Sequence, residues 1–229
     1  MKKPTLAPFY MLMFTEVMAA NMVHPVTPSF LTALGMPDQM FGVAFAAMSL
    51  TNFWLCPFWG RVGDLYSRVK TMSLTIVLYA VGQFLFLRST TAWQILLARL
   101  FSGAFSGGTT VCLMAYGADA VGEEHCGRQM AICAAMTSAG TAAGYLVGGV
   151  LGDISVETAF LWQIALLVLS ALGMLLFLKD GACYHRSSGG LLASLDPLCP
   201  FRRQSVFFFF RGGCISALRF PGLLCKHRL

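Results

Sequence analysis

Charged side chains are scarce in this sequence. Only 11% of its 229 residues are Asp, Glu, Lys or Arg, whereas soluble globular domains carry roughly 25%. Hydrophobic residues make up 57% of the chain, and the mean hydropathy is +0.69. This leaves too little polar surface for an ordinary soluble enzyme or a nucleic-acid-binding domain, even though the net charge is +6. The composition instead indicates a protein embedded in a lipid bilayer.

Regular cysteine spacing is also lacking. The eight cysteines are scattered, so they predict neither a disulfide framework nor a metal site. The pairs Cys183 with His185 and Cys225 with His227 have residue types that bind zinc, but not the usual spacing. No Ser, His and acid lie at a shared membrane depth, which would be needed for hydrolysis inside the bilayer. We therefore expect no metal, no cofactor and no enzymatic activity.

Long apolar runs are what the sequence has instead. Six of them are long enough to cross about 30 Å of hydrocarbon. They cover residues 7–31, 41–60, 71–88, 93–117, 129–152 and 158–178. Unpaired backbone groups are costly in lipid and these runs do not alternate as barrel strands do, so all six are expected to be helices. The predicted fold is an all-α membrane protein, with a bundle of six transmembrane helices over residues 1–180.

The basic residues predict how this bundle is oriented and separate it from a tail. With the amino terminus in the cytoplasm, eight basic residues fall on the inner side and only Arg88 falls in an outer loop. Residues 1–180 hold nine basic and nine acidic side chains, whereas residues 181–229 hold seven and one. The whole net charge therefore comes from the tail, which shows no helical periodicity. We expect it to be disordered or unrelated to the bundle, with basic residues that can contact anionic lipid.

An acidic residue lies inside the first apolar run. Glu16 is about ten residues into the range 7–31, which is roughly 15 Å deep at the rise of a helix. Asn21 and His24 lie on the same helix face. An ionisable group at this depth faces a bundle interior or a cavity, so we interpret Glu16 as a proton or cation site. The alternatives are a permanently protonated acid at Glu16 and, for His24, an interfacial histidine at a helix kink beside two prolines.

Two later runs carry small residues at helical spacing. Arg99 heads such a stripe, which includes Gly103, in the range 93–117. Its fixed positive charge faces either the bundle interior or, by snorkelling, the outer interface. The range 129–152 contains a run of glycines, Gly140, Gly144, Gly148 and Gly149. Glycines at intervals of four predict close packing against a neighbouring helix.

Several of these residues form recognisable motifs. Gly60, Asp64 and Arg68, with Lys70 close by, resemble the G-x-x-x-D-R-x-G-R-K signature of the major facilitator superfamily. Arg99 and Gly103 resemble its R-x-x-x-G signature in the fourth helix. The glycines from 140 to 149 resemble the fifth-helix signature of its antiporters, although Tyr145 stands where a proline is usual. The resemblance covers about residues 7–178 and is to the amino-terminal six-helix half of a proton-coupled drug antiporter, similar to tetracycline-resistance proteins.

The resemblance implies a function and roles for residues. It implies a plasma (inner) membrane transporter that exports small amphipathic organic compounds, driven by the proton gradient without a cofactor. Arg99 would act in proton coupling, the fifth-helix glycines would form a bending face, and Arg68 would face Asp119 at an inner gate. The other expected gate residues are Gly60, Asp64, Lys70 and Arg128.

The same resemblance implies two nested three-helix repeats and an absent second half. The expected partners are a small-molecule substrate, protons, the bilayer, and either a second six-helix half or another copy of the chain. The alternative is a truncated or frame-shifted product that forms an orphan membrane bundle and transports nothing.

Overall fold

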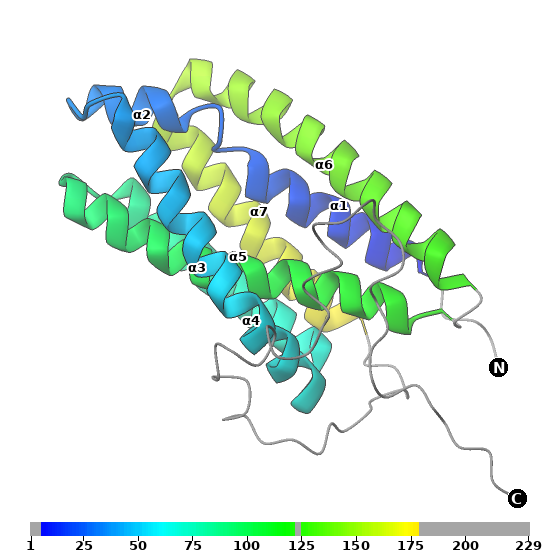
Figure 1. Ribbon diagram of the computed structural model, residues 1–229. Coiled ribbons are helices and arrows are strands. Elements are labelled where there is room, and N and C mark those ends of the chain that lie inside the picture. The colour runs from blue at the N-terminus through cyan, green and yellow to red at the C-terminus, as the bar shows by residue number, and fades with distance from the viewer. Residues whose placement is uncertain (1–5, 122–124, 179–229) are drawn as a thin grey trace, which may run out of the picture. The chain divides into compact units, whose positions relative to one another are not determined.

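The computed structural model describes residues 6–121 and 125–178 (Figure 1). All regular secondary structure in these ranges is helical. The helices are α1 (Ala7–Asn21), α2 (Thr27–Ala33), α3 (Gln39–Leu65), α4 (Arg68–Leu87), α5 (Ala92–Asp119), α6 (Cys126–Ile154) and α7 (Val156–Phe177). Within the described ranges, the five helices from α3 to α7 are long and apolar enough to cross a membrane. The predicted tail, residues 181–229, lies outside the described residues.

Hydroxyl side chains cap the start of three of these helices. Ser67 accepts a hydrogen bond from the backbone N–H of Lys70 at the start of α4, and Ser155 accepts one from that of Thr158 at the start of α7. At the start of α5, Thr91 and Gln94 form a reciprocal capping box. These caps pair donors that would otherwise be exposed at a helix end, and they set the helix starts within a few residues of the predicted runs.

The prediction of one continuous helix over residues 7–31 is wrong, because the chain breaks between α1 and α2. Pro25 has no backbone N–H and its ring collides with the carbonyl of the fourth residue before it. Around the break the hydrogen bonds shorten to three-residue steps, from the N–H of Met22 to the carbonyl of Ala19 and from that of His24 to that of Asn21. Neither part of this segment alone has the length of a membrane span.

The helices pack in two groups that share a pattern. In one group α3 and α4 both lie along α5, and in the other α6 and α7 both lie along α1 (Figure 1). Contacts between α4 and α7 join the groups. If the first segment is exchanged with α5, α3 with α6 and α4 with α7, this set of packed pairs is unchanged. That is the arrangement expected of two three-helix repeats.

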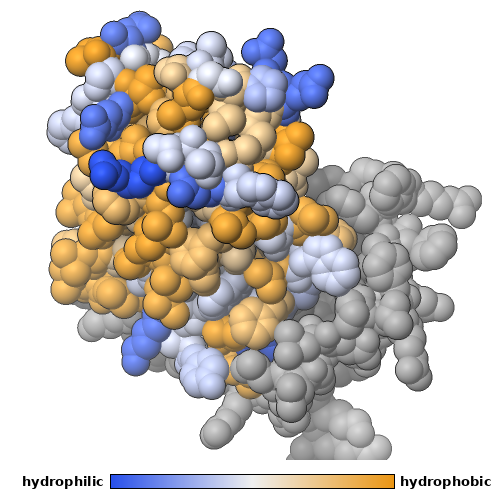
Figure 2. Space-filling view, turned by 90° about the vertical axis from the view of Figure 1, so that its left-hand side faces the viewer, coloured by the Kyte–Doolittle hydropathy of each residue, from blue (hydrophilic) through white to orange (hydrophobic). Residues whose placement is uncertain are grey.

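Burial differs strongly among the membrane-length helices. In its most apolar stretch, α4 is 61% buried and α5 is 50% buried, whereas α3 is 6% and α6 is 17% buried. Apolar side chains cover most of the face in Figure 2, and hydrophilic ones gather toward its top. Large apolar side chains such as Phe53, Trp54 and Leu146 are exposed, which is expected where lipid or another membrane protein covers a surface. The interior that a site can use lies along α1 and α5, because the other long helices pack on these two.

Candidate functional site

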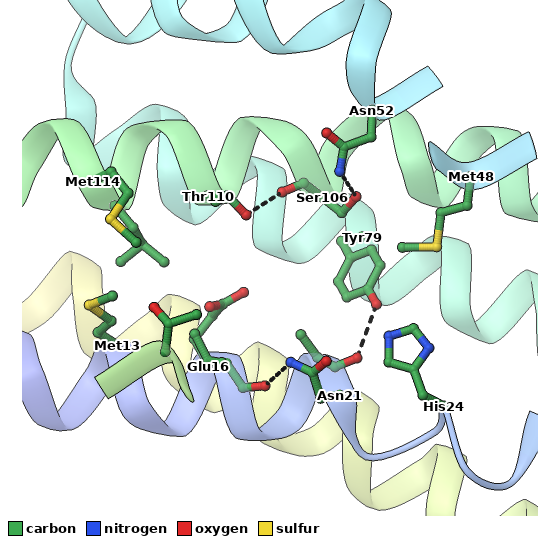
Figure 3. Close-up of a pocket in the computed structure, with 14 residues that line it drawn as sticks. Met13, Glu16, Asn21, His24, Met48, Asn52, Tyr79, Ser106, Thr110 and Met114 are labelled. Carbon is green, nitrogen blue, oxygen red and sulfur yellow. Dashed lines mark hydrogen bonds between the residues drawn. The ribbon is translucent and has the colours of Figure 1, made fainter. Parts of the chain in front are cut away.

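A cavity of about 250 Å³ lies between the two helix groups (Figure 3). Most of its lining comes from α1 and α5, with further side chains from α3, α4 and α6. Its apolar part includes the methionines Met13, Met48 and Met114. Methionine side chains are flexible and polarisable, so they adapt to ligands of different shapes. The cavity thus combines an adaptable apolar wall with a few polar groups, as ligand pockets do.

Glu16 points into this cavity from α1, as the sequence predicts (Figure 3). Its side chain is buried, with 6% of the residue exposed. Among the described residues it makes no hydrogen bond and no ion pair. A carboxyl in such a place is costly to ionise unless a proton or a cation joins it. The Glu16 carboxyl is therefore a candidate site for binding a proton or a cation.

Asn21 and His24 also line the cavity, so the predicted polar face of the first segment is present. The amide nitrogen of Asn21 donates to the carbonyl of Val17 at 2.8 Å. His24 follows the end of α1, and its ring makes edge contacts with Phe45 of α3 and Tyr145 of α6, with centroids 5.5 and 6.2 Å away. It therefore combines the two expected properties: it lies at the break and it faces the site.

Two polar residues of the cavity, Asn52 and Tyr79, were not predicted from the sequence. Asn52 of α3 donates from its amide to the hydroxyl of Ser106 at 3.2 Å, and the hydroxyl of Tyr79 of α4 donates to the backbone of α1 (Figure 3). An amide in the middle of an apolar run was a usable signal for Asn52. Tyr79 had no such signal, because tyrosine is common in buried helices and at membrane interfaces alike.

Arg99 does not line the cavity, which separates it from the Glu16 group with which it was predicted. The side chain is buried, and its Nη2 donates to the hydroxyl of Thr27 at 3.2 Å. The guanidinium also lies 3.7 Å from the centre of the Phe86 ring. These neutral partners hold the positive charge at the His24 end of the bundle, where it connects α5 to α2 and α4.

At the opposite end, Arg68 joins three helices through two ion pairs. Its Nη2 lies 2.9 Å from a carboxylate oxygen of Asp64, and its Nε lies 2.8 Å from one of Asp119. The predicted proximity of Arg68 and Asp119 is present. Two other expected gate residues, Lys70 and Arg128, are exposed and make no ion pair with a described residue. This Arg68 cluster connects the end of α3, the start of α4 and the end of α5.

We expect Arg68→Ala to loosen this end of the bundle, because it leaves two carboxylates without their shared cation. Both pairs are partly exposed, so the expected loss is at most about 1 kcal/mol of unfolding free energy. Thermal unfolding of the purified protein at low and high salt would measure it, with the exposed Arg88→Ala at the other end of α4 as the control. An equal or smaller loss from Arg68→Ala than from Arg88→Ala would contradict the role of the cluster.

The predicted glycine stripes form close helix contacts. A Cβ on Gly144 or Gly148 would collide with the carbonyl oxygens of Met18 and Met22, and one on Gly140 would lie 3.1 Å from Val17. These positions bring the backbone of α6 against that of α1.

The stripe on α5 contacts a different helix. A Cβ on Gly103 would collide with the carbonyl oxygen of Met48 in α3. Gly149 does not belong to the packing face, in contrast to the prediction, because a Cβ there would have no neighbour within 4 Å in the part of the chain that the structure describes. It follows Gly148 directly and so lies about 100° around the helix from it.

Known proteins match this chain in sequence and in fold. The profile described as Major Facilitator Superfamily matches residues 9–224. The staphyloferrin B transporter of Staphylococcus aureus is 30% identical over 159 residues, which are 67% of this chain and 38% of that protein. The class G tetracycline resistance protein of Vibrio anguillarum is 28% identical over 178 residues, which are 76% of this chain and 44% of that protein.

A solved structure shows the same fold. The crystal structure of the human organic anion transporter MFSD10 aligns with a TM-score of 0.69 at 19% identity, covering 86% of this chain and 53% of that one. The chain thus spans about half or less of the length of the proteins it matches.

Proposed function

The chain belongs to the major facilitator superfamily and is a multi-pass membrane protein, and from this premise we propose that it acts in proton-coupled export of small amphipathic cations. In this proposal Glu16 is the site at which a proton and the substrate cation alternate. The apolar wall of the cavity binds the rest of the substrate. The transmembrane proton gradient supplies the energy, and no cofactor takes part.

The observation that carries the proposal is the charge of the cavity. Glu16 is the only carboxyl among the described residues that line it, and no Lys or Arg is among them. A buried carboxylate without a partner attracts a cation and repels an anion. This favours a cationic substrate over an anionic one, although the fold is shared with an organic anion transporter. Tetracycline resistance in one relative's name agrees with export of organic compounds.

The remaining parts of the proposal concern the arrangement in the membrane. We place α1 and α2 together as one interrupted span, which with α3 to α7 makes six spans. The amino terminus lies in the cytoplasm, so the Arg68 cluster is an inner gate of a plasma-membrane transporter. A second six-helix half, or a second copy of the chain, completes the substrate path, because alternating access requires two units that rock around a midplane site.

The test is substrate-driven proton movement in liposomes that contain a pH-sensitive dye. Ethidium, an aromatic cation, serves as the probe, and fluorescein serves as the anionic control. We expect ethidium to drive proton flux when the chain is present with the carboxyl-terminal half of a related transporter, and fluorescein to drive none. Flux with the chain alone would support a complete path from two copies. Absence of flux in both preparations would overturn the proposal and favour an orphan bundle without transport.

A further inference from the structure

The break after α1 leaves the backbone carbonyl of Ala20 without a hydrogen-bond donor from the backbone of its own segment. In a continuous helix the N–H of His24 would donate to the carbonyl of Ala20, four residues earlier. Here it donates to Asn21 at 3.3 Å instead. No backbone N–H of the described chain reaches the carbonyl of Ala20. An unpaired carbonyl inside a membrane protein costs several kcal/mol, so this group needs another donor.

Two side chains from different helices supply donors to that carbonyl. The hydroxyl of Tyr79 in α4 donates to the Ala20 oxygen at 3.4 Å, and the amide nitrogen of Gln163 in α7 donates to it at 3.2 Å (Figure 3 for Tyr79). Gln163 is fully buried and Tyr79 is 3% exposed. We call this arrangement, the Ala20 carbonyl with Tyr79 and Gln163, the carbonyl clamp.

The clamp lies one helical turn after Glu16. Residues four apart lie on the same helix face, and both Glu16 and Ala20 line the cavity. A helix turns by about 100° per residue, so a modest rotation of α1 about its axis would turn the Glu16 carboxyl away from the cavity. The clamp connects this turn of α1 to α4 and α7 through two hydrogen bonds.

We propose that Tyr79 and Gln163 are positioning residues, which set the rotation of α1 and thereby aim the Glu16 carboxyl into the cavity. The inference rests on the proposed function, because it takes Glu16 as the group whose direction matters. The two donors come from α4 and α7, and of the described residues on these helices only Tyr79 lines the cavity.

A chemical label can report the direction of Glu16 without any transport. Dicyclohexylcarbodiimide modifies protonated carboxyls in apolar surroundings, and mass spectrometry of the protein in lipid nanodiscs gives the labelling rate. Glu16→Gln defines the background. In the double variant Tyr79→Phe with Gln163→Leu, we expect the rate at Glu16 to fall about tenfold, the factor that corresponds to about 1.4 kcal/mol. An unchanged rate would overturn the proposal.

A third substitution separates positioning from simple stabilisation. Pro25→Ala restores a backbone N–H, so the helix can continue through the break and His24 can donate to the Ala20 carbonyl again. Added to the double variant, it should restore the thermal unfolding temperature but not the labelling rate, because α1 is still not tied to α4 and α7. Recovery of both quantities would show that the clamp only satisfies the carbonyl, which would overturn its positioning role.

The matched control removes a comparable hydroxyl elsewhere on α1. The hydroxyl of Tyr10 donates to the side chain of Gln129 in α6 at 2.5 Å, and Tyr10 does not line the cavity. Tyr10→Phe should leave the labelling rate within about twofold of the wild type. A fall as large as that of the clamp variant would overturn the proposal, because any loosening of α1 would then suffice. Failure of the proposed function would appear separately, as absent ethidium-driven flux in the wild type.

Discussion

Glu16→Gln is expected to abolish ethidium-driven proton flux and to weaken ethidium binding by a factor on the order of 30 to 5,000. The factor follows from the cost of about 2–5 kcal/mol for removing one partner of a buried charge pair. Glutamine keeps the size of the side chain and its capacity for hydrogen bonding, but it neither ionises nor binds a proton. Ethidium binding to the purified protein, measured by fluorescence, gives the first quantity, and the liposome assay gives the second.

The control for this prediction is Glu157→Gln, the same chemical change at an exposed position in the first turn of α7. It should leave both quantities unchanged, and it should lower stability by less than about 1 kcal/mol through the helix dipole. Glu16→Gln should unfold no more easily than the wild type, because it removes a buried ionisable group that has no partner among the described residues. Wild-type flux in Glu16→Gln would exclude this carboxyl as the coupling site.

Gly148→Ala should destabilise the bundle by about 1–3 kcal/mol, the usual cost of an added methyl group in a tightly packed contact. The new Cβ would collide with the carbonyl oxygen of Met22, which is backbone and cannot move aside as a side chain can. The collision lies beside the break, so α1 and α6 must separate where the segment changes direction. Thermal or denaturant unfolding of the purified protein in detergent measures the loss.

The neighbouring glycine provides the control for this prediction. Gly149→Ala adds the same methyl group where no atom of the described residues lies within 4 Å. Because alanine favours a helix by up to about 1 kcal/mol over glycine, this variant should be as stable as the wild type or slightly more stable. Equal losses from the two variants would show that helix propensity or lipid contact, not packing on α1, decides the effect.

The five later helices were predictable because an apolar run of that length has one stable conformation in lipid. The break in the first segment was considered only as a helix kink beside His24, since hydropathy averaged over a run does not register a missing N–H. Two prolines, Pro25 and Pro28, were the available signal. A proline alone does not predict a break, because α3 continues through Pro57. The position of each proline relative to the hydrogen bonds of its helix has to be considered as well.

The site was predictable where its residues share one helix. Glu16, Asn21 and His24 could be placed together because spacing along the sequence fixes their relative directions. Tyr79 could not be added to them, because the rotation of α4 against α1 depends on packing among all the helices. The direction of the Arg99 side chain could not be predicted for a related reason. This long side chain reaches Thr27 and Phe86 instead of the cavity. Motif and spacing therefore identify candidates within a helix, whereas their assembly across helices requires the structure.

The burial of α4 has a consequence for how the protein is made. Buried polar side chains such as Thr75 and Gln83 lie on this helix, and α7 is one of the helices that cover it. During synthesis α4 enters the bilayer before α7 exists, so the face of α4 that α7 later covers is still exposed. The order of translation therefore opposes the order of packing. Until α7 is made, α5 or the insertion machinery has to shield the polar side chains of α4 from lipid. A chain released before α7 would expose these side chains to lipid.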